Sequence, residues 1–167
     1  MRILGVDPGS RITGFGVIEV DGPRLRVIDA GTVQLADLPM PERLKRLYSA
    51  LGDIIHANGP DEFAIEKVFV QKNVESALKL GQARGVAICA AAMQGLGVHE
   101  YAPNQIKLAV VGRGHAAKEQ MQHMVKILLR LNELPSRDAA DALACAVCHA
   151  HSRNSPLHAP SLRVRAV

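Results

Sequence analysis

The sequence predicts an α/β fold in which helices flank a mixed sheet of three antiparallel strands followed by parallel strands. Two observations carry this prediction. The first 29 residues hold three strand-like runs joined by tight turns, and from Pro41 onward helical and strand patterns alternate. The chain has 167 residues, which suits one domain, and no repeat or linker divides it.

Three strands are expected at the start of the chain. "RILGVD" at 2–7 is an apolar run that ends at a Pro-Gly turn, and "TGFGVIEV" at 13–20 has a second strand pattern. Asp21-Gly22 predicts a hairpin turn into "RLRVID" at 24–29, whose arginines alternate with apolar residues. Tight turns between consecutive strands predict an antiparallel meander.

Helical spacing then begins at Pro41 and stops at Gly59-Pro60, and a fourth strand ends near Glu66. The segment 73–94 is rich in Ala and Gly and predicts a long helix. Each glycine inside a helix costs up to about 1 kcal/mol relative to alanine. We therefore expect another helix to approach this one closely, such as a helix from a second subunit.

The C-terminal part continues the alternation of strand and helix. A short strand and three helices are expected at 97–101, 103–110, 117–131 and 137–151. Residues 1–152 therefore form the predicted domain. The tail 153–167 is basic and has two prolines and no acidic residue, so we expect it to be disordered.

Composition limits the classes of function. The net charge of +4 and the pI of about 9.2 suit a polyanionic partner without requiring one. Only 3% of residues are aromatic, which argues against a base-stacking platform. No apolar run reaches the roughly 18 residues of a membrane span, and no signal-peptide pattern is present. We expect a cytoplasmic protein without a membrane partner, and the odd number of cysteines argues against a disulfide framework.

Four carboxylates are candidates for one site. Asp7 and Glu66 each end a predicted strand, and Asp138 and Asp141 share one face of the last predicted helix. If the first and fourth strands are parallel neighbours, docking of that helix would bring all four acids together. Such a cluster would repel itself unless a hard cation such as Mg²⁺ balanced the charge, and two ions about 4 Å apart can hydrolyse a phosphodiester. Taken singly, each acid is better explained as a turn residue or as a charge that complements a helix dipole, and only the set of four favours chemistry.

Three stretches in order along the chain resemble the RuvC family of Holliday junction resolvases. They are "GVDPGSRITGFGVI", "FAIEKVFVQKNVESALKLGQARGVA" and "SRDAADALACAVCHAH", and the resemblance covers about residues 1–152. It implies a ribonuclease-H-like fold, a homodimer, and a Mg²⁺-dependent endonuclease of recombination and repair. Such an enzyme cuts four-way DNA junctions by paired nicks that leave 5′-phosphate and 3′-hydroxyl ends. The resemblance also implies the branch-migration proteins RuvA and RuvB as partners.

The resemblance assigns roles to individual residues. The acidic set of the family falls on the four carboxylates above, with two Mg²⁺ ions per active site and Mn²⁺ as a substitute. Lys107 and Lys118 match the basic residues near the scissile phosphate, and Phe69 matches a side chain that wedges beside the junction crossover. From the residues alone, the default interpretation is that the lysines are solvated helix charges and that Phe69 is a core aromatic. Further candidates for phosphate contacts are Lys72, Lys79, Arg84 and Arg113.

Three other motifs match known functional patterns only in part. "CAVCH" at 145–149 matches haem attachment, but buried thiols on a packed helix are the simpler interpretation. "GRGHAAKE" at 112–119 lacks the second glycine and the Ser/Thr of a phosphate-binding loop. "DPGSRITGFG" is similar to the phosphate hairpin of actin-like ATPases, but those proteins need two domains. The alternatives to a nuclease are a junction-binding protein without catalysis and an actin-like nucleotide-binding fragment.

Overall fold

The computed structural model describes residues 1–68, 73–114 and 117–153, and these residues build one five-stranded sheet in the order β3-β2-β1-β4-β5. The strands are β1 (Arg2–Asp7), β2 (Ile12–Asp21), β3 (Arg24–Gln34), β4 (Glu62–Glu66) and β5 (Gly97–Tyr101). The first three pair antiparallel, and β4 and β5 continue the sheet parallel to β1. The predicted mixed sheet is confirmed.

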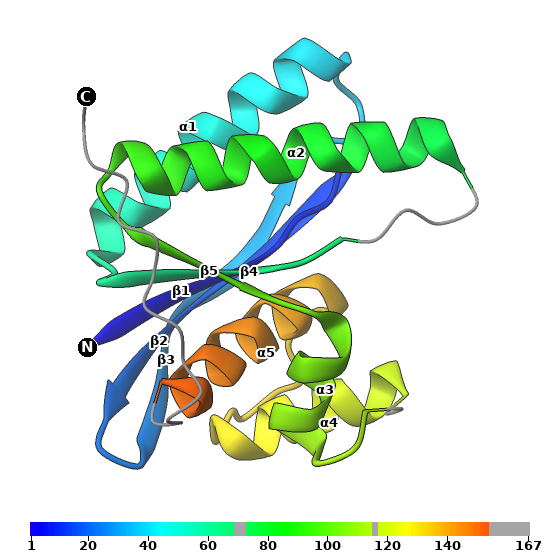
Figure 1. Ribbon diagram of the computed structural model, residues 1–167. Helices are drawn as coiled ribbons and strands as arrows, with labels where there is room; N and C mark the ends of the chain where they lie inside the picture. Colours follow the sequence, from blue (N-terminus) through cyan, green and yellow to red (C-terminus); the bar gives the residue numbers. More distant parts are fainter. Residues whose placement is uncertain (69–72, 115–116, 154–167) are drawn as a thin grey trace.

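Helices cover both faces of the sheet, with α1 and α2 on one face and α3, α4 and α5 on the other (Figure 1). They are α1 (Met40–Asn58), α2 (Val74–Met93), α3 (Pro103–Val111), α4 (Lys118–Leu128) and α5 (Arg137–Ser152). Each face has its own apolar cluster, and alternate residues of β1 and β4 enter opposite clusters, as expected for a sheet buried on both sides. None of the described helices is long and apolar enough to cross a membrane.

The third strand is longer than the sequence pattern predicts. It continues past Asp29 to Gln34 as the edge strand beside β2. Ala30 and Gly31 have low strand propensity, so the local pattern ends too early. Pairing with β2 holds this extension, because Gly31 is the partner of Phe15 and a Cβ on Gly31 would lie 3.1 Å from the Phe15 ring.

The fourth helix is shorter than predicted. It ends at Leu128 instead of Leu131, and Arg130 has a φ of 51° in the left-handed region. A residue in that region cannot continue a right-handed helix. The apolar residues Leu129 and Leu131 still pack on the core, which explains why the hydrophobic pattern alone extends the prediction.

The last helix lies against the sheet over most of its length. Every residue from Ala142 to Ala150 is buried. A Cβ on Gly5 of β1 would collide with the carbonyl oxygen of Ala142 and lie 2.7 Å from the nitrogen of Ala146. Small residues on both surfaces therefore allow the helix backbone to approach the strand backbone.

Helix α5 ends at Ser152, and the predicted boundary of the domain at residue 152 stays a prediction. Arg153, the first residue of the predicted tail, still contacts the fold, because its Nε lies 2.9 Å from Oε2 of Glu62. Residues 154–167 lie outside the described residues, so the predicted disorder of the tail stays a prediction.

Candidate active site

Two of the predicted acids lie at the same edge of the sheet. Asp7 is the last residue of β1 and Glu66 is the last residue of β4. These strands are parallel neighbours, and their register pairs Val6 with Ile65. Asp7 and Glu66 are the next residues on the two strands, so they lie side by side. The predicted cluster required the first and fourth strands to be parallel neighbours, and the structure has this pairing.

The other two acids reach this edge because α5 begins there. Ser136 caps the helix by accepting a hydrogen bond from the Ala139 backbone nitrogen, which starts the first turn at Arg137. The carbonyl of Asp138 lies so close to Gly14 that a Cβ on this glycine would collide with it. Gly14 is the partner of Asp7 in the β1–β2 ladder, so the first turn of α5 lies over the end of β1.

The four acids interact electrostatically. Burial, followed by the charges of Glu66, Asp141 and Asp138, raises the pKa of Asp7 to about 8. Burial and then the charge of Asp141 raise the pKa of Glu66 to about 7. Burial also raises the pKa of Asp141, and the nearby charge of Asp138 adds to this effect. Without a cation, the site therefore holds protons near neutral pH.

Two lysines face the same site. Lys107, half-buried in α3, and Lys118, the exposed first residue of α4, both lower the pKa of Glu66 and Asp141. Lys118 also lowers the pKa of Asp7. Both predicted lysines therefore lie within electrostatic range of the carboxylates, although they come from separate helices. The positive charges balance only part of the negative charge of four acids.

This donor set fits divalent cations such as Mg²⁺. All four candidate ligand side chains are carboxylates, whose hard oxygens Mg²⁺ prefers. Burial first, and then the neighbouring acids, raise the pKa of three of them, so their charged forms are disfavoured unless a cation binds. Divalent cations would displace the protons and restore the charged carboxylates.

The remaining predicted contacts are placed as follows. Lys79 of α2 forms an ion pair with Glu75 at 2.6 Å, and Arg113 is exposed after α3. The guanidinium of Arg84 forms an ion pair with Glu100 and donates from Nε to the carbonyl oxygen of Glu66 at 3.2 Å. Phe69 and Lys72 lie outside the described residues. Contact of any of these side chains with DNA stays a prediction.

A second group of titratable side chains was not predicted. Glu62, His99 and His149 each offer a ligand atom within 4.8 Å of the others, which makes them a candidate metal-binding group. Both ring nitrogens of buried His149 already lie at hydrogen-bond distance from protein groups, 2.6 Å from the Tyr101 hydroxyl and 2.7 Å from Oε2 of Glu62. The ring centroids of His99 and His149 lie 4.2 Å apart, with the ring planes tilted by 31°. These contacts form a hydrogen-bonded network at the start of β4. Its members come from three elements far apart in the sequence, so no sequence motif predicts it.

The cysteines of the "CAVCH" motif are buried beside this network. Cys145 and Cys148 have exposures of 0% and 1%, and burial raises the pKa of the Cys148 thiol to about 11. The expectation of small buried thiols on a packed helix face is confirmed.

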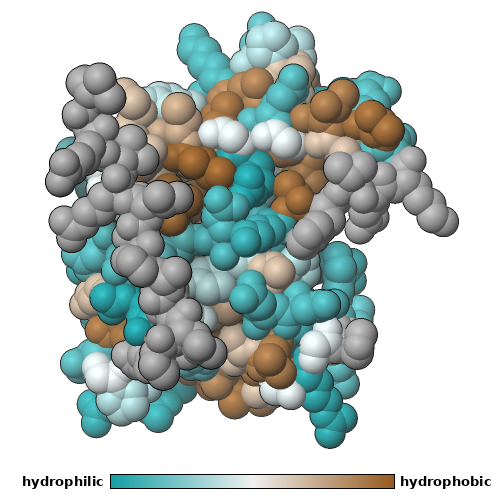
Figure 2. All heavy atoms as spheres, viewed as in Figure 1, coloured by the Kyte–Doolittle hydropathy of each residue, from teal (hydrophilic) through white to brown (hydrophobic). Residues whose placement is uncertain are grey.

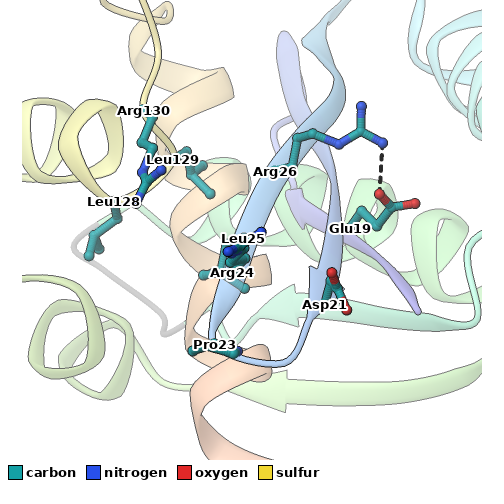
Figure 3. A pocket seen from close by; sticks show the side chains of 9 residues that line it. All are labelled: Glu19, Asp21, Pro23, Arg24, Leu25, Arg26, Leu128, Leu129 and Arg130. Atoms are coloured by element: carbon teal, nitrogen blue, oxygen red, sulfur yellow. Dashed lines mark hydrogen bonds and ion pairs between the residues drawn. The ribbon is translucent and has the colours of Figure 1, made fainter.

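A hollow of about 510 Å³ lies at the opposite end of the sheet (Figure 3). The pairing of Arg2 with Glu19 places it beside the start of β1, whereas Asp7 ends that strand. Its walls come from the β2–β3 turn and the end of α4, with the Glu19–Arg26 ion pair on one side. This hollow is separate from the carboxylate cluster.

The family model for "Crossover junction endodeoxyribonuclease RuvC" matches residues 3–149 of the chain. A protein of that name from Marinobacter nauticus is 56% identical over 155 residues, which are 93% of this chain and 89% of the relative. Another from Dichelobacter nodosus is 55% identical over 150 residues, which are 90% of this chain and 85% of the relative.

Solved structures show the same similarity. The Thermus thermophilus RuvC in complex with a Holliday junction substrate matches with a TM-score of 0.83 and 33% identity. The match covers 92% of this chain and 95% of that one. The yeast mitochondrial resolvase Ydc2 matches with a TM-score of 0.64 at 14% identity over 87% of this chain and 76% of that one, which shows a common fold.

Proposed function

We propose, from the premise that the chain belongs to the RuvC family of crossover junction endodeoxyribonucleases, that it resolves four-way DNA junctions by Mg²⁺-dependent paired nicks. The similarity to a RuvC bound to a Holliday junction supports this substrate. The observation that carries the proposed chemistry is the convergence of Asp7, Glu66, Asp138 and Asp141 from three separate elements.

The four carboxylates would hold the metal, with Asp7 contacting both of two ions and the other three acids completing their shells. Divalent cations bound there supply activation of the attacking water and stabilisation of the leaving 3′ oxygen. Mn²⁺, which also accepts oxygen ligands, would substitute. The products would carry 5′-phosphate and 3′-hydroxyl ends.

The basic side chains have a separate task in this proposal. Lys107 on α3 and Lys118 on α4 lie within electrostatic range of the carboxylates. They would stabilise negative charge that develops on the phosphate during attack. Phe69 would wedge beside the crossover, and Lys72, Lys79 and Arg113 would contact phosphates. Phosphate contacts release counterions, so junction affinity should fall steeply with added salt.

A homodimer would place two active sites on one junction, as paired nicks require. The surface of α2 supports this assembly, because Val74, Leu78 and Met93 are 66%, 65% and 70% exposed. Figure 2 shows apolar surface over α2 at the top of the view. Apart from the adjoining residues and nearby backbone of α2 itself, no atom of the described chain lies within 4 Å of a Cβ built on Gly81 or Gly85, so another helix could approach there.

The family resemblance alone supports three further proposals. RuvA and RuvB are proposed partners during branch migration. The cytoplasm is the proposed location, because chromosomal junctions form there in bacteria. The nuclease domain is proposed to comprise residues 1–152, and 153–167 to form a separate tail.

A labelled synthetic four-way junction tests the function. With Mg²⁺ we expect paired cuts near the crossover, and none without it. Asp7→Asn should bind the junction with nearly normal affinity and not cut it, because binding depends on basic side chains. Asp21→Asn makes the same chemical change at the exposed β2–β3 turn and should cut normally. Bound but uncut junction with the unaltered protein would favour a junction-binding protein, and normal cutting by Asp7→Asn would overturn the proposed active site.

A further inference from the structure

Arg84 links α2 to the end of β4. It extends from the middle of the helix, and only 19% of its side chain is exposed. Its Nε donates to the carbonyl oxygen of Glu66 at 3.2 Å, and its terminal nitrogen forms an ion pair with the carboxylate of Glu100 on β5. One planar guanidinium therefore joins a helix and two neighbouring strands.

This link reaches Glu66 from the side opposite to the proposed active site. In β4, Phe63 and Ile65 belong to the apolar cluster that contains α2, whereas Ala64 belongs to the cluster that contains α5. Because side chains alternate along a strand, Glu66 extends toward α5 with Ala64. Arg84 thus holds the backbone of Glu66 from the α2 face, while the carboxylate of Glu66 extends toward the other acids on the α5 face.

One further hydrogen bond holds the peptide unit that follows the Cα atom of Glu66. The nitrogen of Lys67 donates to the Tyr101 carbonyl at 2.8 Å, and this is the last ladder-like bond between β4 and β5. Lys67 and Val68 follow outside any helix or strand. The Glu66 carbonyl and the Lys67 nitrogen belong to the same peptide unit, so Arg84 and Tyr101 hold this unit at its two ends. Without Arg84 the unit would keep only the bond to Tyr101, and the side chain of Glu66 would be held less firmly.

We propose that Arg84 is a positioning residue that fixes the carboxylate of Glu66 through its backbone, with Glu100 orienting the guanidinium. This inference rests on the proposed function, because it assigns a task to Glu66 in the active site. It differs from a phosphate contact, for which the guanidinium would need free donors and uncompensated charge. Groups that orient ligand side chains in this way typically contribute 10- to 100-fold to activity.

Three variants test the proposal. Arg84→Gln removes the charge and the planar fork, Arg84→Lys keeps the charge but loses the fork, and Glu100→Gln keeps an acceptor but removes the ion pair. We expect each to lower the single-turnover cutting rate on saturating junction, by about 10- to 100-fold for both Arg84 variants and less for Glu100→Gln. The junction Kd and its dependence on salt should stay unchanged. Arg24→Gln, at the exposed β2–β3 turn, is the matched control and should cut at the normal rate.

Glu100→Gln best distinguishes a positioning role of Arg84 from a phosphate contact. Removing an acid near DNA should strengthen binding if electrostatics alone matter, yet the positioning role requires slower cutting. This carboxylate is 41% exposed, so the variant also tests the idea if the Arg84 variants fail to fold, which thermal unfolding would reveal.

The outcomes that overturn the proposal are distinct from failure of the proposed function. Weaker junction binding and a smaller salt dependence in Arg84→Gln, with normal affinity in Arg84→Lys, would identify a phosphate contact. Normal cutting by Glu100→Gln would exclude the orienting role of Glu100, and normal cutting by both Arg84 variants would exclude the positioning role of Arg84. Glu66→Gln serves as the reference: if it cuts normally, the proposed active site is wrong, and if it is inactive while both Arg84 variants cut normally, only the positioning role is wrong.

Discussion

The backbone of Gly14 lies directly against the carbonyl of Asp138, so closely that no other side chain would fit between them. Gly14 is also the partner of Asp7 across the β1–β2 ladder. This contact sets the height of the first turn of α5 above the sheet. It therefore determines how closely the aspartates of the helix approach the aspartate of the first strand.

A methyl group at this contact should separate the helix from the strand. We expect Gly14→Ala to lower the free energy of unfolding by about 1–3 kcal/mol, the usual cost of overpacking, and to slow junction cutting because Asp138 is displaced. Urea denaturation and a cutting assay measure the two effects. In the matched variant Gly52→Ala, the new methyl group meets no described atom within 4 Å apart from the adjoining residues and nearby backbone of α1, so stability should rise by up to about 1 kcal/mol. Unchanged stability in Gly14→Ala would contradict the close packing.

The stability of the metal-free protein should depend on pH through Asp7. Its pKa is raised from 3.8 to about 8 in the folded protein, so the folded state binds a proton that the unfolded chain releases. The stability from this proton is complete below about pH 4 and is lost as pH rises toward 8. Asp7→Asn should therefore melt like the unaltered protein near pH 4 and at least roughly 2–4 °C higher at pH 8.

Metal addition provides the check on that assignment. At pH 8, Mg²⁺ should raise the melting temperature of the unaltered protein more than that of Asp7→Asn, because binding compensates a charge that the variant lacks. If the two proteins had the same melting curve at every pH with chelator present, ionisation of Asp7 would not destabilise the folded protein.

Lys118 should affect the chemical step more than junction binding. It is the basic residue whose charge lowers the pKa of Asp7, Glu66 and Asp141 together. We expect Lys118→Gln to slow single-turnover cutting by about 100-fold, the usual effect of removing one group that stabilises developing negative charge. Lys126→Gln changes a half-buried lysine at the other end of α4 and should cut normally. Equal effects of the two variants would mean that the general charge of α4 matters and not its first residue.

The apolar surface of α2 should be needed for dimerisation. Leu78 is 65% exposed, and Leu78→Glu would place a charge in the proposed contact between subunits. We expect the variant to be a monomer by light scattering and to lose paired cutting. Ile127→Glu alters a residue that is 61% exposed on α4 and should leave the dimer intact. A dimeric Leu78→Glu protein would place the interface elsewhere.

Much of this fold follows from local patterns. The strand patterns at 2–7 and 13–20 and the helical spacing in α1 and α5 depend on residues within a few positions of one another, so the sequence alone predicts them. The errors fall where distant contacts override the pattern. Pairing with β2 extends β3 across Gly31, and the left-handed Arg130 ends α4 within an apolar run.

The amino-acid sequence by itself determined which acids end strands, that Asp138 and Asp141 share a helix face, and which family the motifs resemble. Only the tertiary structure decided that β1 and β4 are neighbours, that glycines let α5 approach the sheet, and that Arg84 is engaged with Glu66 and Glu100. The physical reason is range. Hydrophobic periodicity records which face of an element is buried, whereas the partner across that face depends on residues far away in the chain.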